Sequence, residues 1–456
     1  MKTGVILAAG AGTRIWPYAV VRPKVMIPVA NRPIVSYAVD AMKAAGIQRI
    51  IIAASDLSER IANYYRNDGS VSVFVTGRTK GTAETLGRVL ESCEAEGVLV
   101  MYGDSIVGHA DVKRLLSLFA EKGNAVLVQR LPERETSRDW VCCTLKNGLL
   151  ASIVGHPRDE ATHRFCAFAL KGDIFPYVRN NSGIFTDVQV GMMPPLESYL
   201  EMSLSDFIRD GGRIAACETE SDCIDIDKPW HILMANSMVL KARCGELTRN
   251  ECGEGSSIDP SADISGFVRL GRESRIGRNV RIKGSLIAGD NTIIENGAMI
   301  EGDAIVGNDS YIGNYCLLSD CSTVGDRCVV NHCAELDGII MDTVYLYHYM
   351  EFYGIIGSNT DLGAATVCGT LRFDDGETVH RIKGRREYPL RYANASYIGD
   401  YARTGVNAVI MPGVKVGVYS IVGPGVILSE DIPDRTIVMA KQEQERRSWG
   451  PERYGW

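Results

Sequence analysis

Two periodicities divide the chain, and the first is an alternation of short apolar runs with apolar residues at helical spacing. Each run is short enough for a buried strand and too short to cross a membrane. The predicted strands are residues 5–9, 49–54, 71–75, 97–102 and 125–130. The predicted helices are residues 33–45, 58–65, 82–93 and 112–122. Strands that alternate with helices predict a parallel sheet with helices on both faces. Residues 1–243 are therefore predicted to form a Rossmann-like, doubly wound α/β domain.

The second periodicity begins after a polar, glycine-bearing segment, residues 244–256, which is predicted to be a linker. From Ile258 to Val330 an apolar residue occupies every sixth position without a slip. A period of six fits neither a helix nor an alternating strand, and is typical of a hexapeptide parallel β-helix with three faces per coil. The period is lost near Asp342, returns at Ile356, and is interrupted by a charged excursion at residues 372–397.

The period resumes at Ile398 and continues to Leu428. Residues 257–437 are therefore predicted to be an all-β domain of parallel hexapeptide coils. The last segment, residues 438–456, is predicted to be a polar tail.

Composition narrows the class of function without naming one. The 456 residues carry 49 basic and 56 acidic side chains, a net charge of −7, which argues against a non-specific nucleic-acid binder. No basic run indicates a membrane surface. The 13 cysteines are scattered, with no zinc-type pair spacing and no signal peptide before them, so we expect reduced thiols in a cytoplasmic protein.

Candidate chemistry gathers where the first predicted strand ends. Gly10 and Gly12 follow that strand, and glycine allows the backbone to approach a ligand closely. Successive backbone N–H groups in such a turn can point at phosphate oxygens. Arg14 adds a planar cation and Lys24 a point charge. The residues themselves therefore predict a turn that presents a nucleoside triphosphate to two cations, although a Gly-x-Gly pair alone is often only a turn.

The longer string resembles the signature of the sugar-phosphate nucleotidyltransferases. The matching segments are Leu7 to Gly10, Gly12 to Arg14, Arg22 to Lys24, Pro28-Val29 and Asn31 to Pro33. The resemblance implies that an NTP reacts with a sugar 1-phosphate to give a nucleotide sugar and pyrophosphate, with Arg14 and Lys24 as catalytic cations. It also implies a set of nucleotide-binding residues. These are Leu7, Ala8, Ala9, Gly10, Gly12, Thr13, Gly81 and Thr82.

Two acidic segments are candidates for a metal site. Asp104 follows the strand at 97–102, and Asp225 and Asp227 precede a helix predicted at residues 229–241. Taken alone, a lone aspartate after a strand is more often a turn or helix cap, and Asp227 could cap the helix. The family resemblance implies Mg²⁺ on Asp104 and Asp225, with Asp227 as helix cap or second ligand. Oxygen ligands suit this hard cation.

The predicted sugar pocket departs from the commonest family pattern. Tyr102, Gly155 and Cys166 are the positions that the resemblance places at the substrate, but a glutamate and an asparagine usually stand where this chain has Gly155 and Cys166. Residues 76–80 also lack the glutamines that read the base. A pocket that loses partners for sugar hydroxyls reads a different sugar or discriminates less. The base and the sugar therefore stay open.

The second half resembles the left-handed β-helix of the hexapeptide acyltransferases, which implies a homo-trimer. The whole chain resembles the bifunctional uridylyltransferase/glucosamine-phosphate acetyltransferases, especially archaeal-type relatives. Shared segments are residues 339–342, 362–364, 371–374 and 404–407. An acetyltransferase there would use acetyl-CoA and a histidine base, for which His348 is the candidate. His348 aligns with the family's histidine only if one residue is deleted, and Thr370 stands where the family has its catalytic asparagine.

Three hypotheses remain from the sequence. The first is a sugar-1-phosphate nucleotidylyltransferase whose β-helix serves mainly for oligomerisation. The second is an enzyme with an additional acetyltransferase activity, in which the excursion residues Lys383, Arg385 and Arg386 could bind CoA phosphates instead of forming a solvated loop. The third is a non-catalytic regulatory or scaffold protein. Intact Arg14, Lys24 and aspartates favour the first over the third.

Overall fold

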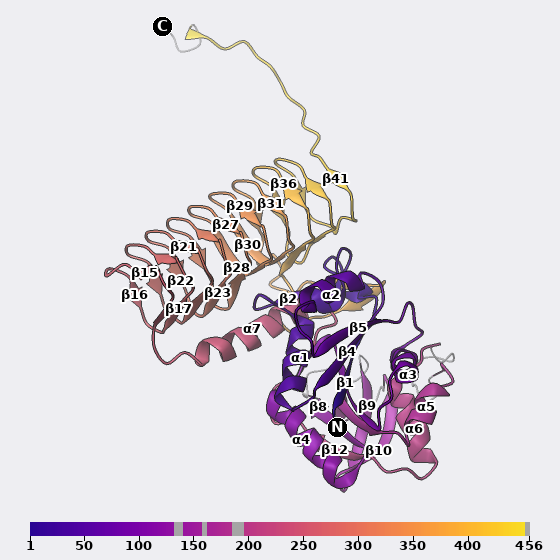
Figure 1. Ribbon diagram of the computed structural model, residues 1–456. Coiled ribbons are helices and arrows are strands. Elements are labelled where there is room, and N and C mark those ends of the chain that lie inside the picture. Colours follow the sequence, from indigo (N-terminus) through magenta and orange to yellow (C-terminus); the bar gives the residue numbers. More distant parts are fainter. Residues whose placement is uncertain (132–139, 157–161, 185–195, 452–456) are drawn as a thin grey trace. The chain divides into compact units, whose positions relative to one another are not determined.

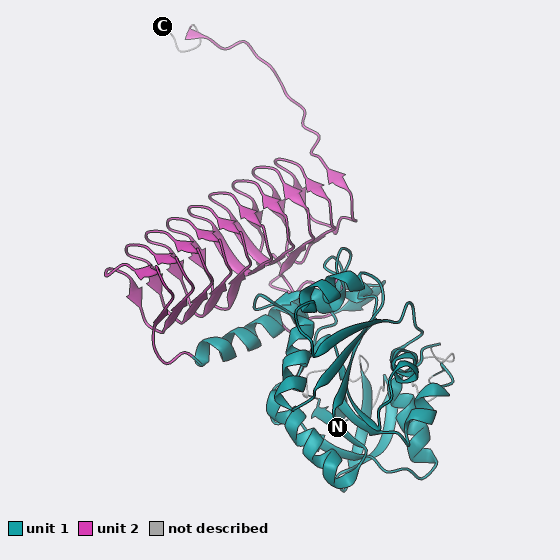
Figure 2. Cartoon of the chain, in the orientation of Figure 1, with its two compact units in different colours: residues 1–246, 381–387 teal, residues 247–380, 388–456 magenta. Residues whose placement is uncertain are grey.

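A computed structural model describes residues 1–131, 140–156, 162–184 and 196–451 (Figure 1). The described chain forms two compact units (Figure 2). The first unit comprises residues 1–246 together with 381–387, and the second comprises residues 247–380 together with the chain from 388 onward. The last five residues of the predicted tail lie outside the described residues. No helix of the described chain is long and apolar enough to span a bilayer.

The first unit is built on one nine-stranded sheet with the strand order β5-β4-β1-β6-β11-β8-β12-β10-β9. Its strands are β1 (Thr3–Ala8), β4 (Arg49–Ala54), β5 (Val71–Val75), β6 (Gly97–Tyr102), β8 (Ala125–Arg130), β9 (Val141–Lys146), β10 (Leu149–Gly155), β11 (His163–Lys171) and β12 (Ala215–Glu218). β1 pairs in parallel with β4 on one side and with β6 on the other. The five predicted strands are present with small shifts at their ends.

Helices cover both faces of this sheet, as the alternating pattern predicts. The helices are α1 (Ile34–Ala44), α2 (Ser58–Tyr65), α3 (Thr82–Ser92), α4 (His109–Lys122), α5 (Phe175–Arg179), α6 (Leu200–Arg209) and α7 (Pro229–Gly245). Val5 and Leu7 of β1 pack in one core with α3, α5 and α6. Ile6 and Ala8 pack in the other core with α1, α2 and α4. Successive side chains of a strand point to opposite faces, so one apolar run supplies both cores.

The prediction of a parallel sheet is wrong for β9, β10 and β11. β10 runs antiparallel to its neighbours β12 and β9. β11 is inserted between β6 and β8 and runs antiparallel to both. Residues 163–170 of this strand are buried, as expected for a central strand that is covered on both faces. The later strand β11 fills the position between β6 and β8, and these two strands therefore do not pair with each other.

The second unit is a parallel β-helix whose coils repeat every 18 residues. Ile258 pairs with Ile276, Ile276 with Ile294 and Ile294 with Ile312, so three hexapeptides form one coil. One sheet consists of β15 (Ser257–Ile258), β18 (Arg275–Ile276), β21 (Ile293–Ile294), β24 (Tyr311–Ile312), β27 (Val329–Val330), β29 (Tyr345–Leu346), β31 (Asp361–Leu362), β36 (Arg403–Thr404), β39 (Ile421–Val422) and β41 (Ile437–Val438). The predicted six-residue period is confirmed, and left-handedness stays a prediction.

The other strands of the β-helix form one branched sheet. They are β14 (Glu251–Cys252), β16 (Asp263–Ile264), β17 (Val268–Leu270), β19 (Arg281–Ile282), β20 (Leu286–Ala288), β22 (Met299–Ile300), β23 (Ala304–Val306), β25 (Leu317–Leu318), β26 (Ser322–Val324), β28 (Glu335–Ile340), β30 (Glu351–Ile356), β32 (Val367–Cys368), β35 (Ser396–Ile398), β37 (Val409–Ile410), β38 (Lys415–Val416) and β40 (Ile427–Leu428). β14 pairs with β17, although it lies inside the predicted linker 244–256. The linker is therefore shorter than predicted at both ends, since α7 continues to Gly245 and β14 begins at Glu251.

The period is lost near Asp342 because two coils are shorter there. Leu346 pairs with Val330 and Leu362 pairs with Leu346, a register of 16 residues instead of 18. β28 and β30 run straight through the position at which earlier coils turn. Their stacked residues Gly338 and Gly354 have φ angles of 137° and 132°. Glycine adopts such angles without the steric cost that a side chain would bring.

The charged excursion contains a two-stranded hairpin, β33 (His380–Ile382) and β34 (Arg385–Glu387). Residues 381–387 group with the first unit, whereas the sequence assigned them to the β-helix domain. His380 itself is buried, and its Nε2 lies 2.7 Å from the carbonyl oxygen of Ala393. Burial, together with the positive charge of Lys415, lowers the pKa of His380 to about 4 from 6.5, against the opposing effect of Asp431.

His380 predicts a loss of stability on mild acidification. Its pKa is lower in the folded than in the unfolded chain, so the unfolded chain takes up the proton first as the pH falls from 6.5 towards 4. At pH 5 this amounts to about 2 kcal/mol. Urea unfolding at pH 7 and pH 5 measures it. Glutamine does not titrate. We therefore expect the free energy of unfolding of His380→Gln to fall by about 2 kcal/mol less than that of the wild type between pH 7 and pH 5. Equal losses in both proteins would contradict the assignment.

Candidate active site

The site begins at the point where the strand order changes direction. From β1 the chain first adds β4 and β5 on one side of the sheet, and then β6 on the other. Ligands of such sheets bind beyond the carboxyl ends of the strands at this point. The turn with Gly10 and Gly12 follows β1, and Asp104 follows β6. Two of the sequence candidates thus lie at neighbouring strand ends.

The glycine turn is shaped by a left-handed residue. Gly12 has a φ of 62° and precedes the short 3₁₀ helix η1 (Thr13–Ile15), which carries Arg14. A Cβ atom at Gly12 would lie 3.0 Å from the Cβ of Lys24 and 2.8 Å from that of Ala19. Glycine therefore allows the turn to approach the backbone of η2 (Lys24–Met26). This packing brings the two predicted cations to the same region.

A small antiparallel ribbon brings the second acidic segment to Asp104. β7 (Ser105–Ile106) follows Asp104 directly and pairs with β13 (Ile224–Asp225), in a register that sets Asp225 opposite Ser105. The hydroxyl of Ser105 donates a hydrogen bond to Asp225 Oδ1 at 3.1 Å. Residues 120 positions apart are thereby held on one side of the site.

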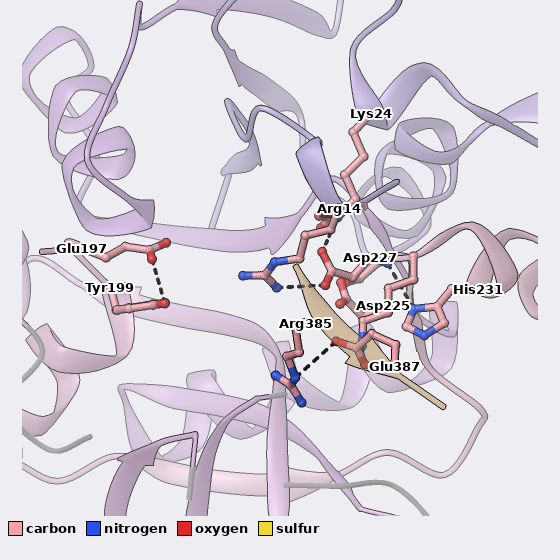
Figure 3. A network of polar contacts seen from close by, with 12 residues as sticks. Arg14, Lys24, Glu197, Tyr199, Asp225, Asp227, His231, Arg385 and Glu387 are labelled. Atoms are coloured by element: carbon pink, nitrogen blue, oxygen red, sulfur yellow. Dashed lines mark hydrogen bonds and ion pairs between the residues drawn. The ribbon is translucent and has the colours of Figure 1, made fainter. Parts of the chain in front are cut away.

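Lys24 is the centre of the charged network that Figure 3 shows. Its Nζ lies 2.6 Å from Asp104 Oδ2 and 3.5 Å from Asp227 Oδ1, and its side chain is 9% exposed. Arg14 Nη1 donates to Asp227 Oδ2 at 2.9 Å, and the Arg14 side chain is 48% exposed. The structure thus brings together all five charged residues predicted for nucleotidyl transfer, namely Arg14, Lys24, Asp104, Asp225 and Asp227.

The electrostatics of this network shift the pKa values of Asp225 and Asp227 in opposite directions. Burial raises the pKa of Asp225, and the negative charge of Asp104 adds to the effect. Burial also acts on Asp227, but Lys24 and Arg14 outweigh it and lower the pKa of Asp227 to about 2. For Lys24, burial favours the neutral amine, yet the surrounding carboxylates raise its pKa above the ordinary value. Lys24 is therefore a fixed cation at neutral pH.

Asp227 does not cap the helix, as one of the sequence alternatives proposed. The residue before α7 is Lys228, and no side chain caps this end. The Asp227 carboxylate is turned to Arg14 and Lys24 instead, while its backbone N–H donates to His231 Nδ1 at 3.2 Å. Burial and Lys228 lower the pKa of His231 to about 4, so this ring is a neutral acceptor.

Carboxylate oxygens are suitable ligands for a hard divalent cation, but the side chains are not arranged around a common metal position. No set of three or more His, Cys, Asp or Glu side chains among the described residues is arranged to hold a metal. Asp104 and Asp227 are ion-paired with Lys24, whereas Asp225 is half-buried, and desolvation and the charge of Asp104 raise its pKa. A buried carboxylate near like charge is stabilised by a cation. Asp225 and Asp104 are therefore the residues that would hold Mg²⁺.

The other predicted nucleotide-binding residues lie at the start of α3 and at the end of β1. Gly81 packs so closely on Ser198 that a Cβ there would lie 2.4 Å from the Ser198 carbonyl oxygen. Thr82 Oγ1 accepts a hydrogen bond from the Leu200 N–H at 2.8 Å. Leu7, Ala8, Ala9 and Gly10 form the end of β1 and the start of the turn.

The three predicted sugar-pocket residues are buried to different degrees. Tyr102 ends β6, and its hydroxyl donates to the buried Glu201. Gly155 ends β10 opposite Val141 of β9. Cys166 is 1% exposed within the apolar core, and its contact with Cys223 and its burial raise the pKa of its thiol. The negative charge of Asp225 also raises this pKa, so Cys166 lies within electrostatic reach of the charged network.

Several residues of the site were not predicted. Glu201 on α6 lies against Tyr102, and burial raises its pKa. Lys228 Nζ forms a buried ion pair of 2.9 Å with Glu387 Oε2 from β34. The position of Lys228 directly after the acidic segment was the available signal. Glu387 gave none, since it lies 159 residues away from its partner.

The acetyltransferase candidate His348 lies on the β-helix in an aromatic cluster. Its ring stacks on that of His332 at a centroid distance of 5.0 Å, and both rings contact Tyr349 edge-on. Tyr349 is 62% exposed and His348 is partly exposed. His348 thus packs against Tyr349, with a second imidazole beside it.

Two family models match separate parts of the chain. The family described as nucleotidyl transferase matches residues 3–163. The family described as GMPPB C-terminal domain matches residues 251–351. The first match contains Arg14, Lys24 and Asp104, and the second contains His332 and His348.

Full-length relatives are more informative. "Bifunctional protein GlmU" of Methanococcus maripaludis strain C7 is 30% identical over 458 residues, covering 96% of this chain and 97% of the relative. "Bifunctional sugar-1-phosphate nucleotidylyltransferase/acetyltransferase" of Sulfurisphaera tokodaii is 26% identical over 437 residues, covering 94% and 97%. Among solved structures, a UDP-glucose pyrophosphorylase complexed with UDP-glucose covers 53% of this chain and 100% of its own, with a TM-score of 0.46 and 19% identity.

Proposed function

The chain is a sugar-phosphate nucleotidyltransferase of the GlmU family, and from this premise we propose that it joins an NTP and a sugar 1-phosphate into a nucleotide sugar. A phosphate oxygen of the sugar 1-phosphate attacks the α-phosphorus of the NTP. The new oxygen–phosphorus bond forms as the bond between the α-phosphorus and the β-phosphate oxygen breaks, and pyrophosphate leaves. Such transfer depends mostly on positioning and on neutralisation of charge.

The single observation that carries this proposal is the buried Lys24 between Asp104 and Asp227, next to the turn that carries Arg14. Arg14, which is the more exposed cation, contacts the phosphates of the NTP. Lys24 neutralises charge at the α-phosphate and the incoming phosphate. When bound at Asp104 and Asp225, Mg²⁺ supplies further positive charge to the phosphate oxygens. Asp227 holds both cations in place.

Pyrophosphate release tests this function directly. Each of the four common NTPs is incubated with the full chain, Mg²⁺ and one of glucose 1-phosphate, mannose 1-phosphate or N-acetylglucosamine 1-phosphate. We expect at least one pair to release pyrophosphate and to yield the corresponding nucleotide sugar. No release from any pair would instead favour the non-catalytic scaffold hypothesis. The same panel identifies the base and the sugar.

An additional acetyltransferase activity is the better-supported interpretation of the β-helix. The relatives named as bifunctional align over 94% to 96% of this chain, which is far more than the nucleotidyltransferase unit alone. His348 is partly exposed and lies next to a second histidine. His348 accepts a proton from the amine of an amino-sugar phosphate as the amine nitrogen bonds to the acetyl carbon of acetyl-CoA. The thioester C–S bond breaks, and the CoA thiolate leaves and takes up a proton to become the free thiol. Oligomerisation, with the trimer as our expectation, is compatible with this role.

Thiol release from acetyl-CoA separates the two interpretations of the β-helix. With glucosamine 1-phosphate as acceptor, we expect release by the wild type and at least about a hundredfold less by His348→Ala. Glucose 1-phosphate, which has no amine, is the matched control and should give no release. Absence of release with glucosamine 1-phosphate would leave the β-helix with oligomerisation alone.

A further inference from the structure

The hairpin β33–β34 interrupts the hexapeptide segment, but its residues 381–387 belong to the first unit. Glu387 anchors it there, because its Oε2 pairs with Lys228 Nζ at 2.9 Å and both side chains are about nine-tenths buried, with 11% and 8% exposed. Lys228 directly follows Asp227 in the chain. The hairpin is therefore fastened to the same segment that carries two carboxylates of the charged network.

Arg385 is the hairpin residue that is linked to this network through Glu387 and Lys228. It lies two positions before Glu387 on β34, and residues at this spacing point to the same face of a strand. Its Nε is 3.4 Å from Glu387 Oε1, and its side chain is 55% exposed. In Figure 3 the Arg385 side chain turns to Glu387, and both Arg14 and Arg385 lie to the left of Asp225 and Asp227 in this view. Arg386, the next residue, is also exposed but points to the other face.

The cations of this site differ in what they can offer a ligand. Lys24 and Lys228 are 9% and 8% exposed and lie in buried ion pairs, so they serve as fixed charges. Arg14 and Arg385 are 48% and 55% exposed. Nucleotidyl transfer brings together two substrates that carry phosphate. Arg14 lies on the turn after β1, where the triphosphate is expected, which leaves Arg385 for the second substrate.

We propose that Arg385 binds the phosphate of the sugar 1-phosphate, so that the hairpin from the hexapeptide half of the chain completes the nucleotidyltransferase site. This proposal rests on the proposed nucleotidyl transfer. A guanidinium matches a phosphate group with two parallel hydrogen bonds, and charge-assisted bonds of this kind are among the strongest. Glu387 orients Arg385 through their ion pair and fastens the hairpin through Lys228. The alternative, CoA binding by this basic stretch, becomes an outcome of the test.

The matched variants are Arg385→Ala and Arg386→Ala in the full chain. They remove the same side chain from adjacent positions on opposite faces of one strand. With the most active pair of the substrate panel, we expect Arg385→Ala to raise the KM of the sugar 1-phosphate by roughly tenfold to a hundredfold. The KM of the NTP and the thermal unfolding midpoint should stay within about twofold and 2 °C of the wild type. Arg386→Ala should change neither KM, and Arg385→Lys should restore part of the loss.

Calorimetry with N-acetylglucosamine 1-phosphate, mannose 1-phosphate and glucose 1-phosphate, without NTP, separates this proposal from the proposed function. Binding by the wild type and by Arg386→Ala, but not by Arg385→Ala, supports the role of Arg385 even if no pyrophosphate is released. The role is overturned if none of the three binds, or if Arg385→Ala binds as the wild type does. It is also overturned if the KM of the NTP or of acetyl-CoA rises instead.

Discussion

Replacement of Lys24 by alanine is expected to lower kcat for pyrophosphate release by about a thousandfold or more. The Lys24 ammonium lies 2.6 Å from Asp104 and 3.5 Å from Asp227, in a position where only 9% of its side chain is exposed. Without it, the phosphate charge would approach three carboxylates with one fewer cation to offset them. A buried fixed charge stabilises developing charge far more than a hydrated one, because little water screens it.

Two further variants make this result specific. Lys24→Met keeps most of the apolar stem and removes only the charge, so it should lose activity to the same extent. Lys43→Ala removes a lysine from the exposed ion pair with Asp68, whose contribution to stability is small, and should retain full activity. Thermal unfolding of all three proteins checks their folding. Turnover by Lys24→Met near the wild-type rate would exclude the proposed role of Lys24.

Gly354→Ala is expected to destabilise the β-helix by about 3 kcal/mol or more. The φ of Gly354 is 132°, which side chains rarely adopt, and a Cβ there would lie 1.9 Å from the Ser396 carbonyl oxygen. The obstacle is backbone, so it cannot move aside as a flexible side chain could. A Cβ at the stacked Gly338 would likewise lie 2.1 Å from the Gly354 carbonyl oxygen. The strain therefore affects the short coils that connect the two halves of the solenoid.

Gly376→Ala is the matched control in the same unit. A Cβ at Gly376 would lie nearest to the exposed side chain of Asp374, at 3.2 Å, and this side chain can move. Urea unfolding followed by far-ultraviolet circular dichroism should show a clear loss for Gly354→Ala and at most a few tenths of a kcal/mol for Gly376→Ala. Equal midpoints for the two variants would contradict the geometry of the short coils. Aggregation of Gly354→Ala alone would agree with it.

The same coils explain how far the sequence predicts the β-helix. Positions such as Ile276, Ile294 and Ile312 are inward in every coil, so a constant period marks them as core. The period identifies a coil only while every coil has the same length. The coils that contain Gly338 and Gly354 omit a turn and two residues, and the pattern shifts there although the core remains continuous.

The strands and helices predicted up to residue 130, and the helix predicted at 229–241, are present, whereas β9 to β12, α5 and α6 were not predicted. Each parallel strand is a short apolar run bounded by polar residues, and that information is local. The place of β11 between β6 and β8 depends on pairing between distant segments, which no local pattern encodes. The family match confirms the resemblance to the nucleotidyltransferases that the opening motif indicated.

The candidate site follows the same division. Arg14 and Asp104 were predictable because they follow strands of a parallel sheet, whose carboxyl ends meet at one edge. Lys24 was predicted from its charge near the glycine turn, and the metal role of Asp225 only from the family resemblance. The role of Asp227 as an ion-pair partner depends on the side chains around it, and so the sequence left the cap open as an alternative. The pairing of Lys228 with Glu387 joins segments that no motif relates. The contribution of the excursion to the first unit therefore required the structure.

A crystal structure of the full chain with a bound nucleoside triphosphate tests the central claim most directly. We predict that its phosphates lie against the backbone of Gly10 to Thr13, within hydrogen-bond distance of the Arg14 guanidinium. A triphosphate bound at another place, with the turn after β1 making no contact to phosphate, would contradict the proposed function.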